Sequence, residues 1–133
     1  GPVVGPEPEE MESARESEKK HIVPDLHSTH EVIGYHTSAT DGHIGHVADM
    51  IVDSDTWVVR YLVIGTRDWL PGKNVLIPPD WTRELSRQDR TLVLKVSKAE
   101  VENAPEFNPG EPINRAFEEH LYDYYGRPKY WVA

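Results

Sequence analysis

Trp57-Val58-Val59-Arg60-Tyr61-Leu62-Val63-Ile64-Gly65-Thr66 is the densest run of β-branched, aromatic and aliphatic residues in the chain. Turn-forming residues bound this run at strand length, because Asp53-Ser54-Asp55 precede it and Pro71-Gly72 follow it. We therefore predict that it forms the central strand of a small antiparallel β-domain. The run is apolar on both faces, so we expect the terminal helices or a second subunit to cover the face turned away from the core.

The composition indicates one domain behind an acidic segment. The first twenty residues hold three prolines and six glutamates against three basic residues, and they have no apolar periodicity. Such a segment cannot bury enough surface to offset its ordering entropy, so residues 1–25 are predicted to be an irregular tail or linker. The β-domain is expected over 26–105, and a C-terminal loop, a helix and a docked aromatic end over 106–133.

Charge and residue types exclude several function classes. The net charge is −9 and the only basic run is Lys19-Lys20, so direct nucleic-acid binding is not expected. The chain has no cysteine, which excludes disulfides and sulfur-ligated metals and is consistent with a cytoplasmic location. No apolar stretch approaches the roughly 20 residues that span a bilayer, so no transmembrane segment is expected.

The residues before the central run predict a hairpin. Asp41-Gly42 favours a type I′ turn between a strand over 32–37 and one over 43–53. Ile44 and Val47 would face opposite sides of a flat strand, because they are three residues apart. Either a bulge at Gly45-His46 turns both into the core, or the strand is buried on both faces.

Further strand signals follow the central run. We expect strands over 74–77 and 91–96, with a short segment over 81–85 between them. Short strands separated by regular turn signals indicate a sandwich or barrel.

Two helices are predicted after the strands. Ser97 begins a capping box and Pro105 ends that helix, while Asn114 caps a second helix that stops at Gly126. The second helix is expected to dock through one broad face, made by Phe117, Leu121, Tyr124 and Tyr125.

Several of these stretches resemble the PRC-barrel family. They are Asp41-Gly42-His43-Ile44-Gly45-His46-Val47-Ala48-Asp49, Arg60-Tyr61-Leu62-Val63 and Leu76-Ile77-Pro78. The closing stretches Val101-Glu102-Asn103-Ala104-Pro105 and Tyr125-Gly126-Arg127-Pro128-Lys129-Tyr130-Trp131 are similar to a bacterial subgroup with two barrels in tandem. Within that subgroup the chain resembles the second barrel with its preceding linker.

The resemblance implies a small, strongly bent β-barrel with a short helix and a C-terminal helix packed on it. Its relatives are the cytoplasmic domain of the photosynthetic reaction centre H subunit and the C-terminal domain of a ribosome-maturation factor. It implies a non-catalytic protein-interaction module, and no cofactor is expected. Because the central run is apolar on both faces, the expected partner is a second copy in a homodimer or another PRC-barrel. A ligand- or metal-binding barrel, or a reaction-centre-H-like or ribosome-associated docking domain, is the alternative. The residues expected to shape the fold are Asp41, Gly42, Gly45, Asp49, Pro71 and Gly72.

The sequence offers few candidate residues for metal binding or catalysis. His43 and His46, with His36 and Asp49 nearby in sequence, carry ligand types that zinc accepts. Residues three apart on a flat strand diverge, so surface histidines are favoured and no metal is expected. No catalytic residue is expected either, because the candidate serines lie in turns or caps: Ser28, Ser38, Ser54, Ser86 and Ser97.

Interaction residues are the remaining candidates. Arg60 lies in an apolar strand, so it either forms an ion pair, for example with Asp49, or contacts a partner. The four tryptophans either anchor an interface or plug the barrel ends, and Trp69 is expected to be the most exposed. The predicted interaction residues are Trp57, Arg60, Tyr61, Trp69, Tyr124 and Trp131.

Overall fold

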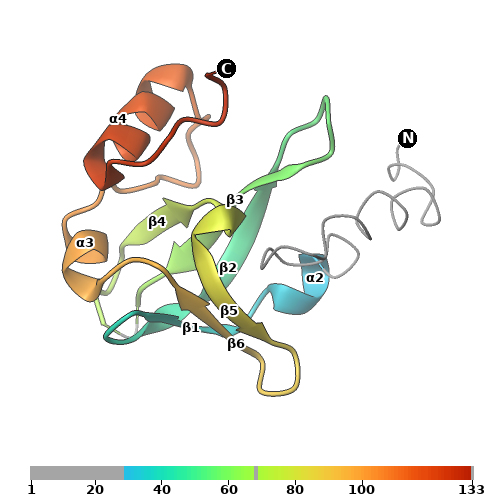
Figure 1. Cartoon of the computed structure of the whole chain (residues 1–133), viewed down its shortest axis with the longest axis vertical. Coiled ribbons are helices and arrows are strands. Elements are labelled where there is room, and N and C mark those ends of the chain that lie inside the picture. The colour runs from blue at the N-terminus through green and yellow to red at the C-terminus, as the bar shows by residue number, and fades with distance from the viewer. Residues whose placement is uncertain (1–28, 68, 133) are drawn as a thin grey trace.

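One strongly bent sheet with helices packed around it makes up the computed structural model, which describes residues 29–67 and 69–132 (Figure 1). The predicted tail over 1–25 lies outside the described residues. The mainly β fold is confirmed. The elements are α2 (Thr29–Val32), β1 (His36–Ala39), β2 (Gly42–Val52), β3 (Val59–Gly65), β4 (Asn74–Ile77), the 3-10 helix η2 (Pro79–Trp81), β5 (Thr82–Ser86), β6 (Thr91–Leu94), α3 (Lys98–Glu102) and α4 (Arg115–Tyr125).

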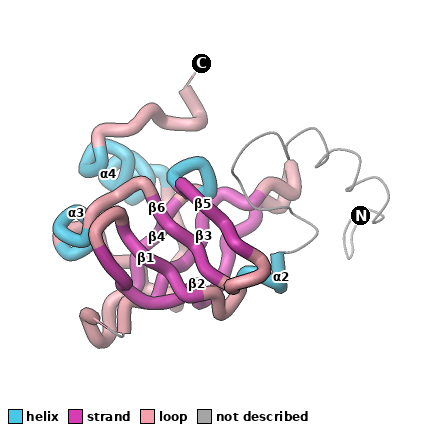
Figure 2. Tube along the Cα trace, turned by 60° about the horizontal axis from the view of Figure 1, so that its bottom comes forward, coloured by secondary structure: helices cyan, strands magenta, loops and turns pink. Residues whose placement is uncertain are grey.

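The six strands form a single sheet in the order β4-β3-β2-β1-β6-β5. The sheet curls on itself without closing into a complete ring of hydrogen-bonded strands (Figure 2). Four of its pairings are antiparallel, but β1 and β6 run parallel, with His36 opposite Thr91. The expectation of a wholly antiparallel barrel is therefore corrected at this pairing, which joins segments far apart in sequence.

The predicted first hairpin is present, with a different turn. Ala39 pairs with Gly42, so the turn residues are Thr40 and Asp41. The non-glycine residues with positive φ in the described part of the chain are Trp57 and Arg90, so Asp41 lacks the conformation that a type I′ turn at Asp41-Gly42 requires. Its carboxylate instead accepts a hydrogen bond from the backbone N–H of Lys98 at 2.9 Å, which ties this turn to α3.

A bulge in β2 turns two apolar residues toward the core. Thr37 lies opposite Gly45 and the next residue of β1 lies opposite His43, so Ile44 is the extra residue, one position before the bulge predicted. Ile44 and Val47 are both fully buried. A Cβ on Gly45 would lie 1.8 Å from the carbonyl oxygen of Gly65, so β2 crosses β3 too closely for any side chain at this position.

The strand predicted over 57–66 is shorter in the structure. β3 begins at Val59, and Trp57 precedes it with a φ of 61°. Every residue of β3 except Arg60 is buried. Both faces of the strand are thus covered, and Tyr61 contacts Tyr122 of α4 with ring centroids 6.4 Å apart. Of the two expected coverings for the face turned away from the core, the terminal helices and a second subunit, helix α4 of the same chain supplies at least part.

The helix ends follow the predicted capping chemistry. Ser97 and Glu100 form the capping box of α3, Asn114 accepts a hydrogen bond from the backbone N–H of Phe117, and Gly126 ends α4 with a φ of 66°. The buried face of α4 differs from the predicted one, because Phe117 and Tyr124 are only partly buried. The buried positions are Glu118, Leu121, Tyr122 and Tyr125.

Candidate functional site

Exposed apolar side chains mark two segments of the molecule. Among the described residues, the large hydrophobic side chains with high exposure are Val52 (42%), Trp57 (40%), Tyr130 (39%) and Val132 (62%). The first two lie in residues 52–58, here named the hairpin tip, which connects β2 to β3 and projects beyond the sheet (Figure 1). The other two lie in residues 127–132 after α4, here named the C-terminal strap.

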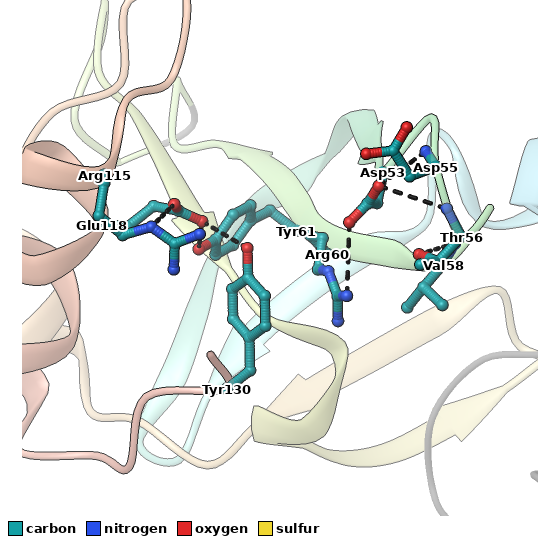
Figure 3. Close-up of polar contacts among 9 residues, drawn as sticks. All are labelled: Asp53, Asp55, Thr56, Val58, Arg60, Tyr61, Arg115, Glu118 and Tyr130. Atoms are coloured by element: carbon teal, nitrogen blue, oxygen red, sulfur yellow. Dashed lines mark hydrogen bonds and ion pairs between the residues drawn. The ribbon is translucent and has the colours of Figure 1, made fainter. Parts of the chain in front are cut away.

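Arg60 joins these two segments. Its guanidinium lies 3.4 Å from a carboxylate oxygen of Asp53 in the hairpin tip. The same group stacks 4.1 Å from the ring centroid of Tyr130 in the C-terminal strap. The ion pair with Asp53 is partly buried, and Figure 3 shows Arg60 between Asp53 and Tyr130. The hairpin tip and the strap are therefore held beside one another.

The ion pair differs from the one predicted. Asp49 is exposed and accepts a hydrogen bond from the backbone N–H of the next residue, whereas Asp53 pairs with Arg60. The register of β2 against β3 shifts twice, between Val47 and Asp49 and between Ile51 and Val52. These shifts change which residues of β2 lie beside Arg60, and sequence spacing alone does not reveal them.

Hydrogen bonds fix the backbone of the hairpin tip. The carboxylate of Asp53 accepts from the backbone N–H groups of Asp55 at 2.8 Å and Thr56 at 3.4 Å. These bonds, chiefly the one from Asp55, together with the charge of Arg60, lower the pKa of Asp53. The carboxylate of Asp53 thus gives the turn a defined shape.

Trp57 occupies a backbone conformation that suits glycine. Its φ of 61° lies in the left-handed region, which costs a residue with a side chain about 1–2 kcal/mol. The backbone N–H of Trp57 donates to the carbonyl of Asp53 at 2.7 Å, which holds it in this position. The fold therefore carries a conformational cost here together with an exposed indole.

A buried carboxylate anchors the other side of the site. One oxygen of Glu118 accepts hydrogen bonds from the hydroxyls of Tyr61 at 2.6 Å and Tyr130 at 3.0 Å. The other oxygen lies 3.5 Å from Arg115. Burial, and then the bond to Glu118, raise the pKa of Tyr61 well above its ordinary value. β3, α4 and the strap thus meet at one acidic group (Figure 3).

Sequence reasoning missed Glu118. A glutamate is usually assigned to the exposed face of a helix, and the predicted face left it out. Its spacing of three from Leu121 and seven from Tyr125 was the available signal, because those positions share a helix face.

Aromatic rings pack around Tyr122, which sequence reasoning also missed. Its ring centroid lies 5.4 Å from that of Trp81 and 5.2 Å from that of Trp131, both edge to face. Burial raises the pKa of Tyr122 to about 12. Trp81 is buried, and Trp131 is half-buried with the guanidinium of Arg115 4.1 Å from its ring centroid. The aromatic end of the chain is therefore pinned to α4.

Two predicted interaction residues lie against α3 instead. Trp69 is half-buried beneath the ammonium of Lys98, 4.9 Å from the ring centroid, so the expectation that it is the most exposed tryptophan is wrong. Tyr124 donates a hydrogen bond to the carbonyl of Glu100 at 2.6 Å. Near Trp69 the predicted Pro71-Gly72 turn is present, with Gly72 at a φ of 86°.

The candidate histidines His36, His43 and His46 lie on the β1–β2 hairpin. His36 is opposite His46, and the rings of His36 and His43 are 5.8 Å apart. Within the described residues, no group of three or more histidine or acidic side chains is placed to hold a metal ion. The alternative of a ligand or metal site at these histidines gains no geometric support from this part of the chain.

Comparison with known proteins assigns the barrel. The family model for the PRC-barrel domain matches residues 25–101, which is more than half of the chain. The match extends into α3 and ends before α4 and the C-terminal strap. No curated protein matches the sequence. None of the helices in the described ranges has the length and apolar character needed to cross a membrane.

Proposed function

The chain belongs to the PRC-barrel domain family, and from this premise we propose that it is a non-catalytic module that docks on another protein. Domains of this family are in general non-catalytic, which agrees with an interaction role. One observation carries the proposal. All the strongly exposed large hydrophobic side chains of the described residues lie on two segments that Arg60 joins, the hairpin tip and the C-terminal strap.

Trp57 supports docking more strongly than exposure alone does. Tryptophan is enriched among the residues that dominate binding energy at protein interfaces. Glycine would fit the left-handed backbone at this position at lower cost. A residue that works against its local backbone is expected at a functional site, where a requirement other than folding selects it.

The C-terminal strap contributes the second part of the proposed surface. It lies outside the matched barrel residues and is fixed by Tyr130 on Glu118 and by Trp131 on Tyr122. A surface already held in place loses less conformational entropy when a partner binds. The proposed docking surface therefore combines a barrel hairpin with a segment added after the barrel.

The identity of the partner is a finer proposal. A homodimer was expected because β3 is apolar on both faces, and α4 covers part of the face turned away from the core. A second copy and a second PRC-barrel remain candidates through the hairpin tip and the strap. Light scattering at micromolar concentration tests self-association, and a strict monomer would remove the homodimer.

The docking proposal is tested by comparing proteins retained from native-cell lysate. The baits are the full chain, Trp57→Gly and, as a matched control on another exposed strand, Arg83→Ala of β5. Circular dichroism first establishes that all three are folded. We expect proteins retained by the unmodified chain and by Arg83→Ala to be lost with Trp57→Gly. Identical retention by all three baits would reject this docking surface.

A further inference from the structure

We propose that the docking partner is a protein whose surface has basic residues around an apolar pocket, and that Trp57 enters this pocket. The inference rests on the proposed function and adds the chemistry of the partner. It follows from the exposed apolar side chains together with the charges that surround them.

The basic groups of the docking surface already have partners within the chain. Arg60 contacts Asp53 and Tyr130, as described above. Arg115 lies 3.5 Å from Glu118 and against the ring of Trp131. Lys129 contacts the carboxylate of Asp123 at 2.6 Å. These cations are therefore poorly placed to attract an acidic partner.

Two exposed aspartates, one in β2 and one in the hairpin tip, lack such compensation. Asp49 and Asp55 are exposed, and neither takes part in an ion pair among the described residues. Asp55 lies two residues from Trp57, and Asp49 lies three residues from Val52. The hairpin tip that carries Trp57 therefore has an exposed carboxylate at Asp55 that is unpaired within the described part of the chain, and Asp49 adds a second along β2, within a chain whose net charge is −9.

This charge distribution favours one class of binding partner over the others. A second copy would bring the same aspartates and the same negative net charge to the contact, and like charges facing one another oppose association. Nucleic acid and anionic membranes are disfavoured for the same reason. A basic protein surface complements Asp49 and Asp55, and an apolar pocket within it would bury the indole.

The shape of the hairpin suits insertion. The hairpin tip projects from the sheet (Figure 1), its turn is held by the bonds to Asp53, and Arg60 fixes its base to the strap. An aromatic side chain on a projecting turn with a fixed backbone enters a concave pocket with little loss of backbone conformational entropy. Val52, Tyr130 and Val132 would then contact the rim of the pocket.

Site-specific photo-crosslinking identifies the occupant. A photoreactive amino acid replaces Ser54 at the exposed turn of the full chain, and in a control protein it replaces Glu84 on β5. Irradiation in the native cell is followed by mass spectrometry of the products. We expect one protein with a basic surface to be crosslinked from position 54 and not from 84. Crosslinking to a second copy or to an acidic protein would overturn the inference.

Binding of the purified partner then separates the inference from the docking proposal. We expect affinity to fall roughly tenfold between about 50 and 300 mM salt, and the double variant Asp49→Asn, Asp55→Asn to lose most of this dependence. Binding that Trp57→Gly abolishes but salt and the double variant leave unchanged would overturn the charge inference and leave docking intact. Binding that is unaffected by Trp57→Gly would reject both.

Discussion

At the two ends of the β2–β3 pair, the residue type fits the local backbone in one case and not in the other. At one end the backbone of Gly45 lies so close to the carbonyl of Gly65 that only glycine fits at position 45, and the sequence has glycine there. At the other end Trp57 takes a conformation that glycine prefers and exposes its ring. Close packing therefore explains the residue type at position 45, but it does not explain the tryptophan at position 57. The contrast indicates that the crossing serves the fold and the hairpin tip serves contact with a partner.

The strongest test of this contrast is Gly45→Ala at the crossing. A Cβ at 1.8 Å from a backbone oxygen cannot be relieved by rotating a side chain, so the strands must separate. We expect the free energy of unfolding to fall by about 3 kcal/mol or more, measured by urea denaturation. Gly110→Ala is the control, since no atom lies within 4 Å of its added Cβ, and it should change stability by less than about 0.5 kcal/mol.

The buried carboxylate gives the next largest effect. Glu118→Ala leaves the hydroxyl of Tyr61 buried without its acceptor and releases Tyr130, so we expect a loss of about 2–3 kcal/mol. Glu119→Ala changes the exposed neighbour on the same helix and should be within about 0.5 kcal/mol of the unmodified protein. Equal effects of the two variants in urea denaturation would contradict the role given to Glu118.

Alkaline pH should weaken the same region. The pKa of Tyr122 is raised to about 12 and that of Tyr61 is raised further, whereas both ionise near the ordinary value of 10.0 in the unfolded chain. Between pH 10 and 12 the unfolded state therefore binds fewer protons than the folded state, and stability falls as pH rises. The contribution of these tyrosines to stability is fully present well below pH 10.

The urea midpoint measured at about pH 8.5, 10 and 11 checks this dependence. Tyr122→Phe removes one of the tyrosines whose pKa is raised, so the decline of the variant above pH 10 should be shallower than that of the unmodified protein. A midpoint that stays constant up to pH 11 would show that these tyrosines do not control alkaline stability.

The smallest change is expected at the hairpin tip. Trp57→Gly relieves the left-handed strain, and we expect stability to rise by roughly 0.5–1 kcal/mol while partner binding is lost. Trp57→Ala retains the strain, so it should lose binding without this gain. A loss of stability above about 1 kcal/mol with Trp57→Gly would mean that the indole supports the fold.

Local chemistry in the sequence predicted the elements that depend on neighbouring residues. Ser97 and Asn114 cap helices through bonds three residues away, and Gly126 ends α4, as expected. The Asp41-Gly42 hairpin and the bulge near Gly45 were also found, though each is displaced by one residue. These features were accessible because the interactions that form them are close in sequence.

The features that sequence reasoning missed depend on the shape of one turn, on two register shifts and on a contact between distant residues. Trp57 was assigned to a strand because aromatic residues favour strands, whereas bonds to Asp53 hold it in a turn. Arg60 pairs with Asp53 and not with the predicted Asp49, because the register of β2 against β3 shifts twice. Glu118 is buried because Tyr61 and Tyr130, far away in the sequence, supply hydroxyl donors. None of these contacts leaves a regular period in the sequence.

The parallel pairing of β1 with β6 has a consequence for the order of folding. β2 and β3 are adjacent along the chain and can pair early. The pairing of β1 with β6, in which His36 lies opposite Thr91, can form only after β6 has been synthesised. During synthesis β1 therefore has only β2 as a neighbour until residues 91–94 have left the ribosome. Contacts of such high sequence separation slow folding, so the last step should be the docking of the β5–β6 hairpin onto β1. A nascent chain paused before residue 91 would present β1 as an unpaired edge.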